Sequence, residues 1–217
     1  MLPSNIEHLQ LARGELSLHL ACLGDGPLVV MCHGYPGLWY SWRHQMTALA
    51  DAGYRAVAMD MRGYGASSRP RDVQAYGFDQ LSGDVLSVFD HFGESRAVLL
   101  GHDFGANLAW YMAVYYPERL RGVAPLCVPY DMELAGGCDV LPSELFAAIA
   151  EQHFFHMHYY QQPGVAEAHL VGRERAFLER LFWALSARGE LLDWEQFPTE
   201  GTHYFDVLAT PAEPLPW

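Results

Sequence analysis

Residues 97–106 read Ala-Val-Leu-Leu-Gly-His-Asp-Phe-Gly-Ala, and this stretch decides the fold. The four apolar residues at its start predict a buried strand, and the helical spacing from about residue 106 to residue 116 predicts a helix directly after it. Small residues at positions 101, 105 and 106 allow the chain to turn sharply between the two elements. The stretch therefore predicts a tight strand-to-helix turn with Asp103 at its apex.

An aspartate at the apex of such a turn points to one kind of chemistry. Its carboxylate is anionic at pH 7, so it can attack saturated carbon and displace an epoxide oxygen or a halide. The product is an alkyl ester of Asp103. A base-activated water must then hydrolyse this ester while backbone N–H groups stabilise the oxyanion. The alternative is an ordinary turn in which the aspartate only caps the helix.

The sequence around this turn alternates between strand and helix patterns. Alternating apolar residues on both sides of residues 13–14 predict a hairpin over residues 6–23. Further strands are expected at 28–32, 54–61 and 123–128, and helices at 39–52 and 78–92. This order is typical of an α/β fold with a mostly parallel sheet and helices on both faces, in which sites collect at the carboxyl ends of the strands.

The pattern changes after about residue 130. Helical segments are expected at 142–152, 164–170 and 173–187, and aromatic residues cluster between 154 and 160. We therefore predict two domains. An α/β core covers residues 1–130, and a helical insertion over residues 131–217 lies above the active edge of the sheet.

The composition argues against several classes of partner. Thirteen arginines, with no lysine, stand against 26 acidic residues and give a net charge of −13, which disfavours nucleic acid and anionic membranes. No apolar run reaches the ~20 residues of a membrane-spanning helix, and the start has no signal-peptide pattern. From the four scattered cysteines we expect reduced thiols and a cytoplasmic location. The arginine bias is typical of a GC-rich bacterial genome.

Further motifs occur in a fixed order around the turn. They are His-Gly-Tyr-Pro at 33–36, Asp-Met-Arg-Gly-Tyr-Gly at 60–65, Tyr-Pro-Glu-Arg at 116–119, and Gln-Pro-Gly-Val-Ala-Glu-Ala at 162–168. With these motifs the chain resembles the α/β-hydrolases of the epoxide hydrolase type, from about residue 6 to its last residue. The resemblance implies the α/β-hydrolase fold with a helical cap, and a reaction that needs no cofactor.

The resemblance also assigns roles in the first half of the reaction. Asp103 is the implied nucleophile. The backbone N–H groups of Tyr35 and Phe104 are the expected oxyanion donors, because the position of the loop that holds Tyr35, after an earlier buried strand, suits that role. The resemblance further implies that the Tyr35–Pro36 peptide bond is cis. The apolar, aromatic cap predicts a small hydrophobic epoxide as substrate.

Opening an epoxide also needs a hydrogen-bond donor or acid for the departing oxygen. In the family this role falls to two cap side chains, usually tyrosines, and counting back seven residues from Pro163 to the first of them gives His156. An imidazole N–H can take the role, as in a minority of relatives. The alternative is a histidine that only fills the core, and Tyr159 and Tyr160 are expected to pack. No metal site is expected in this histidine run, because no carboxylate or cysteine stands at ligand spacing.

The chain departs from the family in the second half of the reaction. The resemblance places its last residue inside the cap, before the final strands, the histidine base and the usual acid. An alternative acid position after the sixth strand holds Cys127, and the late His203 lies on a cap segment. We therefore expect an uncovered sheet edge, poor stability in isolation, and Asp103 alkylation without turnover. A complementing C-terminal segment or a homo-oligomer is the expected protein partner.

Two other functions stay open from the sequence. Haloalkane dehalogenases and fluoroacetate dehalogenases also use an aspartate nucleophile. Haloalkane dehalogenases need side-chain N–H donors for the departing halide at positions where this chain has Phe104 and Tyr35. Fluoroacetate dehalogenases need arginines that hold a carboxylate, where this chain has Phe104 and Asn107. The remaining alternative is a catalytically incomplete fragment that acts by binding another molecule.

Overall fold

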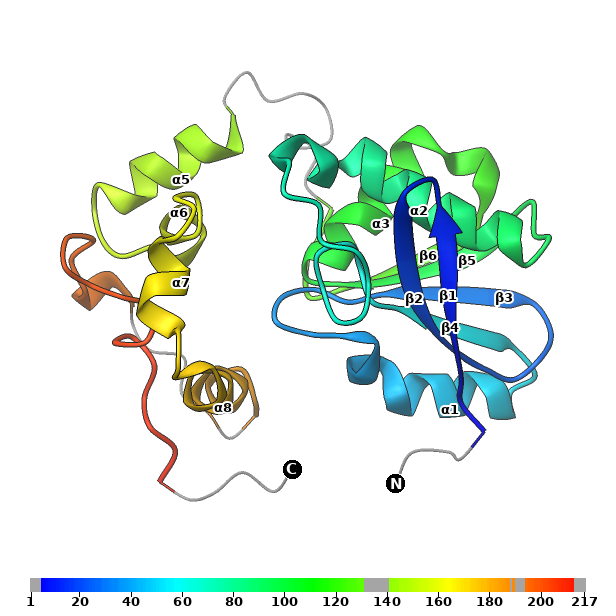
Figure 1. The fold of residues 1–217 in the computed structure, drawn as a ribbon, viewed down its shortest axis with the longest axis horizontal. Coiled ribbons are helices and arrows are strands. Elements are labelled where there is room, and N and C mark those ends of the chain that lie inside the picture. The colour runs from blue at the N-terminus through cyan, green and yellow to red at the C-terminus, as the bar shows by residue number, and fades with distance from the viewer. Residues whose placement is uncertain (1–4, 131–140, 188, 190–193, 213–217) are drawn as a thin grey trace. The chain divides into compact units, whose positions relative to one another are not determined.

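A computed structural model describes residues 5–130, 141–187, 189 and 194–212. The chain divides into two compact units, Met1–Gly137 and Cys138–Trp217, and each is described by itself (Figure 1). The predicted domain boundary at residues 130/131 borders positions outside the described residues and stays a prediction.

Six strands of the first unit form one sheet in the order β1-β2-β4-β3-β5-β6. Strands β4, β3, β5 and β6 run parallel, whereas β1 and β2 pair antiparallel, and β2 joins β4 antiparallel. The bounds are β1 Glu7–Arg13, β2 Leu16–Leu23, β3 Leu28–Cys32, β4 Arg55–Met59, β5 Ala97–His102 and β6 Leu120–Leu126. All five residues of β3 are buried, as expected for a strand covered by helices on both faces.

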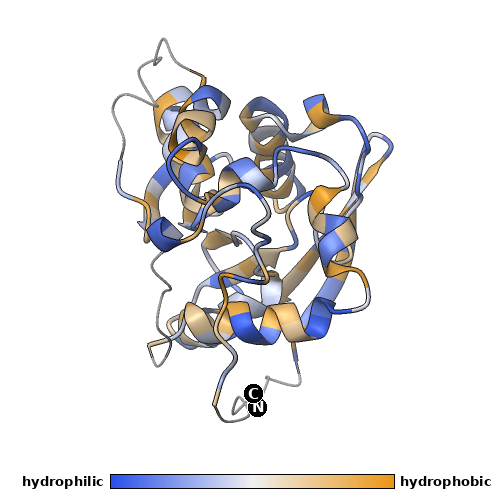
Figure 2. Ribbon diagram, turned by 90° about the vertical axis from the view of Figure 1, so that its left-hand side faces the viewer, coloured by the Kyte–Doolittle hydropathy of each residue, from blue (hydrophilic) through white to orange (hydrophobic). Residues whose placement is uncertain are grey.

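Helices cover both faces of this sheet. Helices α2 and α3 pack on one face, and α1 packs on the other (Figure 1). Their bounds are α1 Arg43–Asp51, α2 Phe78–His91 and α3 Phe104–Tyr115, with short 3-10 turns at η1 Trp39–Trp42, η2 Val73–Tyr76 and η3 Pro117–Arg119. In Figure 2, hydrophobic and hydrophilic residues alternate along the helices, which is typical of helices with one buried face.

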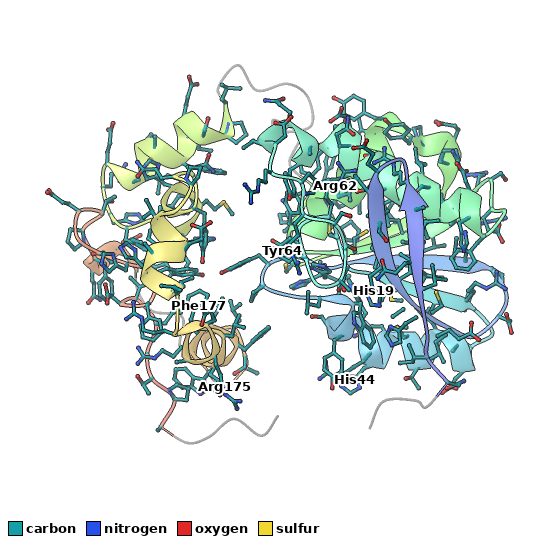
Figure 3. All side chains as sticks on the ribbon, viewed as in Figure 1. His19, His44, Arg62, Tyr64, Arg175 and Phe177 are labelled. Carbon is teal, nitrogen blue, oxygen red and sulfur yellow. The ribbon has the colours of Figure 1, made fainter. Side chains whose placement is uncertain are left out.

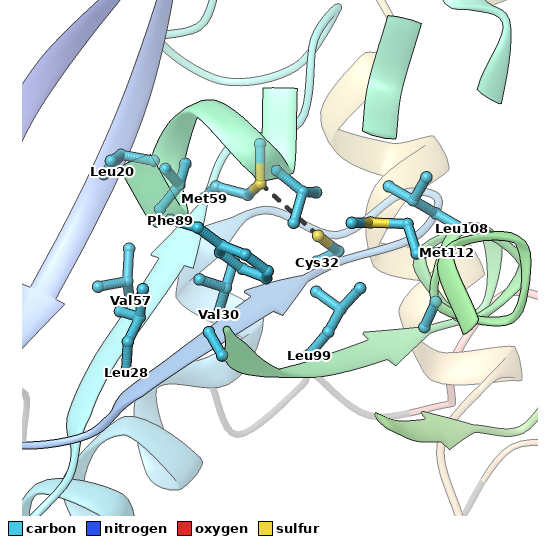
Figure 4. Close-up of a cluster of buried hydrophobic side chains, with 14 of the residues drawn as sticks. Leu20, Leu28, Val30, Cys32, Val57, Met59, Phe89, Leu99, Leu108 and Met112 are labelled. Atoms are coloured by element: carbon cyan, nitrogen blue, oxygen red, sulfur yellow. Dashed lines mark hydrogen bonds between the residues drawn. The ribbon is translucent and has the colours of Figure 1, made fainter. Parts of the chain in front are cut away.

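The larger core lies between the sheet and helices α2 and α3 (Figure 4). Phe89 of α2, Leu99 of β5 and Met112 of α3 are fully buried there, and each such side chain stabilises the fold by about 1.5–3 kcal/mol. The thiol of Cys32 lies 3.6 Å from the Met59 sulfur in the same layer. Trp42 and Met46 fill the smaller core beneath α1.

A buried cluster of charges joins three parts of the first unit. Asp84 of α2 is fully buried and receives two hydrogen bonds from Arg62, Nε to Oδ2 at 2.9 Å and Nη2 to Oδ1 at 2.6 Å. Arg13, at the end of β1, donates a third to Oδ1 at 2.5 Å. The N-terminal hairpin, helix α2 and the segment that follows β4 are thereby tied to one carboxylate.

The second unit is helical in the residues that the structure describes. Its elements are α5 Pro142–Ala150, α6 His156–Tyr159, α7 Val165–Leu170, α8 Glu174–Ala184 and the 3-10 turn η4 Trp194–Gln196. Phe177 and Leu181 of α8 are buried, as are Phe154 and Tyr204 from the connecting segments. The Tyr204 ring contacts the rings of both Phe154 and Phe177, so it joins the parts of this core. Across the described residues, no helix has the length and apolar character needed to cross a membrane.

The predicted α/β fold with a mostly parallel sheet and helices on both faces is confirmed, and the element boundaries need corrections. Helix α3 begins at Phe104 rather than near residue 106, and β6 covers Leu120–Leu126 rather than 123–128. The helix expected at 39–52 begins as the 3-10 turn η1. The short helix α6 was not predicted as a separate element.

Candidate active site

Asp103 occupies the turn between β5 and α3, as the sequence predicts. Its backbone angles are φ 54° and ψ −118°, which lie outside the regions that L residues prefer. It stands at the N-cap position of the 12-residue helix α3, where the helix dipole favours a negative charge. The strained backbone thus holds a carboxylate at the carboxyl end of a central strand.

Glycines make this turn sterically possible. A Cβ atom at Gly101 would lie 2.1 Å from the Gly105 carbonyl oxygen. A Cβ at Gly105 would lie 2.2 Å from the carbonyl oxygen of Cys32. Both contacts are with backbone, which cannot move away cheaply, so the glycines are required where β5, α3 and the end of β3 meet.

The loop after β3 brings the first expected oxyanion donor to the nucleophile. The backbone N–H of Tyr35 donates to Oδ1 of Asp103 at 2.9 Å. At Gly34 the two segments are so close that a Cβ would lie 2.3 Å from the same oxygen. The Tyr35–Pro36 bond is cis, as the resemblance implies. The second expected donor, Phe104, is the first residue of α3, and its ring stacks on Phe78 at 5.4 Å.

His33 holds this loop and does not offer a free base. The Met61 N–H donates to its Nε2 at 3.0 Å, which leaves the proton on Nδ1 to donate to the Gly34 carbonyl at 2.9 Å. Burial lowers the pKa of His33, and neighbouring groups only partly offset this effect. Since both ring nitrogens are engaged and the ring stays neutral, His33 is structural. His102, at the end of β5, is exposed.

Tyr64 is a neighbour of the site that the sequence interpretation did not single out. Its ring meets that of His33 edge-on with centroids 4.9 Å apart. Burial, followed by the charges of Tyr35 and Asp103, raises the pKa of Tyr64 to about 12. The phenol therefore stays protonated beside the nucleophile. The sequence signal that could have identified Tyr64 is its position inside the motif at residues 60–65.

His156, the expected donor of the cap, lies in the second unit as the first residue of α6. Its ring centroid is 4.6 Å from that of Trp194 and 5.8 Å from that of Tyr204. It therefore sits in an aromatic cluster, where the packing alternative and a donor role are both compatible with its surroundings. Because the two units are described separately, the structure brings Tyr35, Phe104 and Asp103 together but does not place His156 among them.

The other cap residues considered from the sequence pack within the second unit. The Tyr159 hydroxyl hydrogen-bonds Nδ1 of His169 at 2.9 Å, and the His203 ring stacks on His169 at 3.5 Å. A pocket of about 240 Å³ in this unit is lined in part by His158, His169 and His203. In the described part of the chain, no three histidine, cysteine, aspartate or glutamate side chains are grouped to hold a metal ion.

Comparison with known proteins defines the class of this chain. The profile of the alpha/beta hydrolase fold family matches residues 27–173, which is most of the chain. The chain therefore belongs to the alpha/beta hydrolase fold family. This assignment agrees with the sheet order and with the strained turn at Asp103.

Several relatives of the chain within this family are epoxide hydrolases. The chain is 43% identical over 169 residues to bifunctional epoxide hydrolase 2 of Sus scrofa, covering 77% of this chain and 30% of that protein. It is 40% identical over 164 residues to epoxide hydrolase A of Mycobacterium tuberculosis, covering 76% and 50%. The crystal structure of epoxide hydrolase A from Mycobacterium thermoresistibile matches with a TM-score of 0.88 and 36% identity, covering 98% of this chain and 66% of that chain. The chain thus spans about a third to two thirds of these relatives' length. Their names favour the epoxide hydrolase interpretation over the dehalogenase alternatives.

Proposed function

We propose that the chain carries the nucleophile half of an epoxide hydrolase, with a small hydrophobic epoxide as substrate. One observation carries the proposal. A carboxylate, Asp103, occupies the strained turn after β5, and the Tyr35 N–H points at its Oδ1 from 2.9 Å. A carboxylate needs no activating base to attack an epoxide carbon. The identities with epoxide hydrolases support the same reaction class.

The proposed step forms one bond and breaks one. An Asp103 carboxylate oxygen attacks an epoxide carbon, the C–O bond of the ring breaks, and its electron pair goes to the epoxide oxygen. The N–H of His156 donates a hydrogen bond to that oxygen, which takes a proton from water. The product is a hydroxyalkyl ester of Asp103. We propose the donor role of His156 from its position in the motif around Pro163.

Hydrolysis of the ester to a vicinal diol needs a water, a base and stabilisation of the oxyanion. The N–H groups of Tyr35 and Phe104 are the proposed oxyanion donors, and each such donor is worth about 3–4 kcal/mol where it has been measured. His33 is unsuitable as the base because both of its ring nitrogens are engaged. We propose that a polypeptide of these 217 residues is alkylated once and does not turn over.

We further propose a bacterial origin and a cytoplasmic location. The arginine-only basic composition supports the first. The free thiols of Cys22, Cys32 and Cys127 support the second, because disulfides are rare in that compartment.

Incubation with styrene oxide, followed by intact mass and peptide mapping, tests the reaction. We expect the full chain to gain the mass of one styrene oxide, with the adduct on Asp103. Asp103→Asn should remain unmodified under the same conditions, and Asp90→Asn, an exposed position on α2, should react like the unmodified sequence. Circular dichroism confirms that both variants are folded.

Four results would contradict the proposal. A chain that stays unmodified, or an adduct that maps elsewhere, would remove Asp103 as the nucleophile. Repeated turnover to diol by this chain alone would show that a base is present. Reaction with a chloroalkane or fluoroacetate but not with the epoxide would favour a dehalogenase.

A further inference from the structure

Asp60 is a buried carboxylate that the proposed reaction does not use. It is 2% exposed, and its Oδ1 accepts the N–H of Trp39 at 3.0 Å. Its Oδ2 accepts the N–H of Ala66 at 3.1 Å and lies 2.8 Å from Nδ1 of His19. Among the described residues, no arginine forms an ion pair with it, and His19 is the side chain that hydrogen-bonds it. A buried carboxylate is costly unless it is hydrogen-bonded, so His19 is central to keeping it there.

His19 connects Asp60 to the surface through a second histidine. It lies on β2 and is buried (Figure 3), and its Nε2 is 3.0 Å from Nδ1 of the exposed His8 on β1. The two rings stack with their planes 9° apart. A carboxylate only accepts hydrogen bonds, so Nδ1 of His19 carries its proton and, in the neutral ring, Nε2 accepts the Nδ1–H of His8. The pair thus forms a directed chain of hydrogen bonds that ends on Asp60.

The other oxygen of Asp60 holds the end of the loop that supplies the oxyanion donor. This loop, here called the oxyanion loop, covers residues 33–39. At its start His33 is fixed to the Met61 N–H, and at its end the Trp39 N–H is fixed to Asp60. Between these anchors the Tyr35 N–H meets Asp103. Both anchors belong to consecutive residues after β4, so a shift of Asp60 is passed directly to the loop.

We infer that His19, oriented by His8, is a positioning residue for the oxyanion loop. It fixes the carboxylate of Asp60, Asp60 fixes the Trp39 N–H, and the loop then presents the Tyr35 N–H to the carboxylate of Asp103. The ring of Trp39 also packs edge-on against His8 at 4.9 Å, which strengthens the coupling between the histidine pair and the loop. The catalytic consequence of this inference rests on the proposed function of Asp103, whereas the ordering of the loop does not.

Substitutions at His19 separate positioning from simple packing. His19→Leu removes the donor to Asp60, whereas His19→Asn keeps an N–H donor near the place of Nδ1. His44→Leu, on the exposed face of α1, is the matched control. We expect His19→Leu to lower the limiting rate of Asp103 alkylation by styrene oxide on the order of tenfold, with the half-saturating epoxide concentration little changed. His19→Asn should recover most of the rate, and His44→Leu should have no effect.

A second measurement does not depend on reactivity. Amide hydrogen exchange of Tyr35 and Trp39, followed by NMR, should become faster in His19→Leu and remain slow in His19→Asn. The ¹⁵N shifts of His19 should show a proton on Nδ1 and none on Nε2. If His19→Leu does not fold, His8→Phe decides by the same readouts, because it keeps the stacked ring at an exposed site and removes the donor to His19.

The outcomes separate the two proposals. Alkylation of His19→Leu at the unchanged rate, with unchanged exchange at Tyr35 and Trp39, overturns the inference. If the unmodified sequence is not alkylated at all, the proposed function fails. Faster exchange in the variant then still supports the positioning role, and unchanged exchange refutes it.

Discussion

Neutralising Asp84 should be among the most damaging changes to the first unit. The substitution Asp84→Asn keeps the size of the side chain and removes its charge. It leaves the guanidinium of Arg62, only 2% exposed, without a counter-charge. It also places an NH₂ group against the Arg62 nitrogens that donate hydrogen bonds to Asp84 in the unmodified sequence. Arg13 loses the same partner.

The expected magnitude follows from burial. Removing one partner of a buried ion pair costs about 3–5 kcal/mol, because the remaining charge stays desolvated. The same α2 helix supplies a matched control in Asp90, which pairs with Arg119 at 2.6 Å but is 67% exposed. An exposed pair of this kind is worth about 0–1 kcal/mol. Asp84→Asn should therefore lower the free energy of unfolding by at least about 2 kcal/mol more than Asp90→Asn.

Urea denaturation of the full chain, followed by far-UV circular dichroism, measures this difference. Hydrogen exchange of peptides from α2 and β4 assigns the transition to the first unit. Equal losses in Asp84→Asn and Asp90→Asn would refute the reasoning. So would a loss below about 1 kcal/mol in Asp84→Asn, since it would mean that the cluster contributes no more than a surface pair.

Three further outcomes are expected. Gly105→Ala should destabilise the first unit by about 3 kcal/mol in the same urea assay, because the new Cβ would meet the Cys32 carbonyl. Gly122→Ala is the control: its Cβ would have open space around it, so the free energy of unfolding should change by less than about 0.5 kcal/mol. A maleimide at pH 8, mapped by peptide mass, should label the exposed Cys127 and spare Cys22 and Cys32, because burial raises their thiol pKa values to about 11 and about 12. These raised values also predict a loss of stability above about pH 9, where the unfolded chain releases thiol protons that the folded chain keeps, and a pH series of urea midpoints that stays flat from pH 9 to pH 11 would contradict this.

Local patterns in the sequence predict the sheet and the turn well. The run at 28–32 becomes β3 with every residue buried, and the glycines at 101 and 105 mark the turn at Asp103. These features depend on neighbouring residues, so the sequence displays them directly. The predicted end of β6 was wrong because Cys127 adopts φ 63° and the strand stops before it. No glycine occupies this position, so the sequence does not signal the positive φ.

The buried polar contacts between distant side chains were not predicted. Arg62 and Asp84 are 22 positions apart, and His19 and Asp60 are 41 apart, so only the folded sheet brings them together. One signal was nevertheless present. Asp84 stands on the buried face of the helix predicted at 78–92, between Leu81 and Val88, and a charge at such a place calls for a buried partner.

The three glycines around Asp103, at positions 34, 101 and 105, affect which nucleophiles this turn can hold. Positions 34, 101 and 105 have no side chains, so no side chain from them limits where the residue at the apex stands. The identity of that residue is then free to change while its location is kept. Replacing the aspartate by serine would keep the position and exchange a carboxylate that attacks saturated carbon for a hydroxyl that attacks acyl carbon. The same turn can therefore hold different nucleophiles.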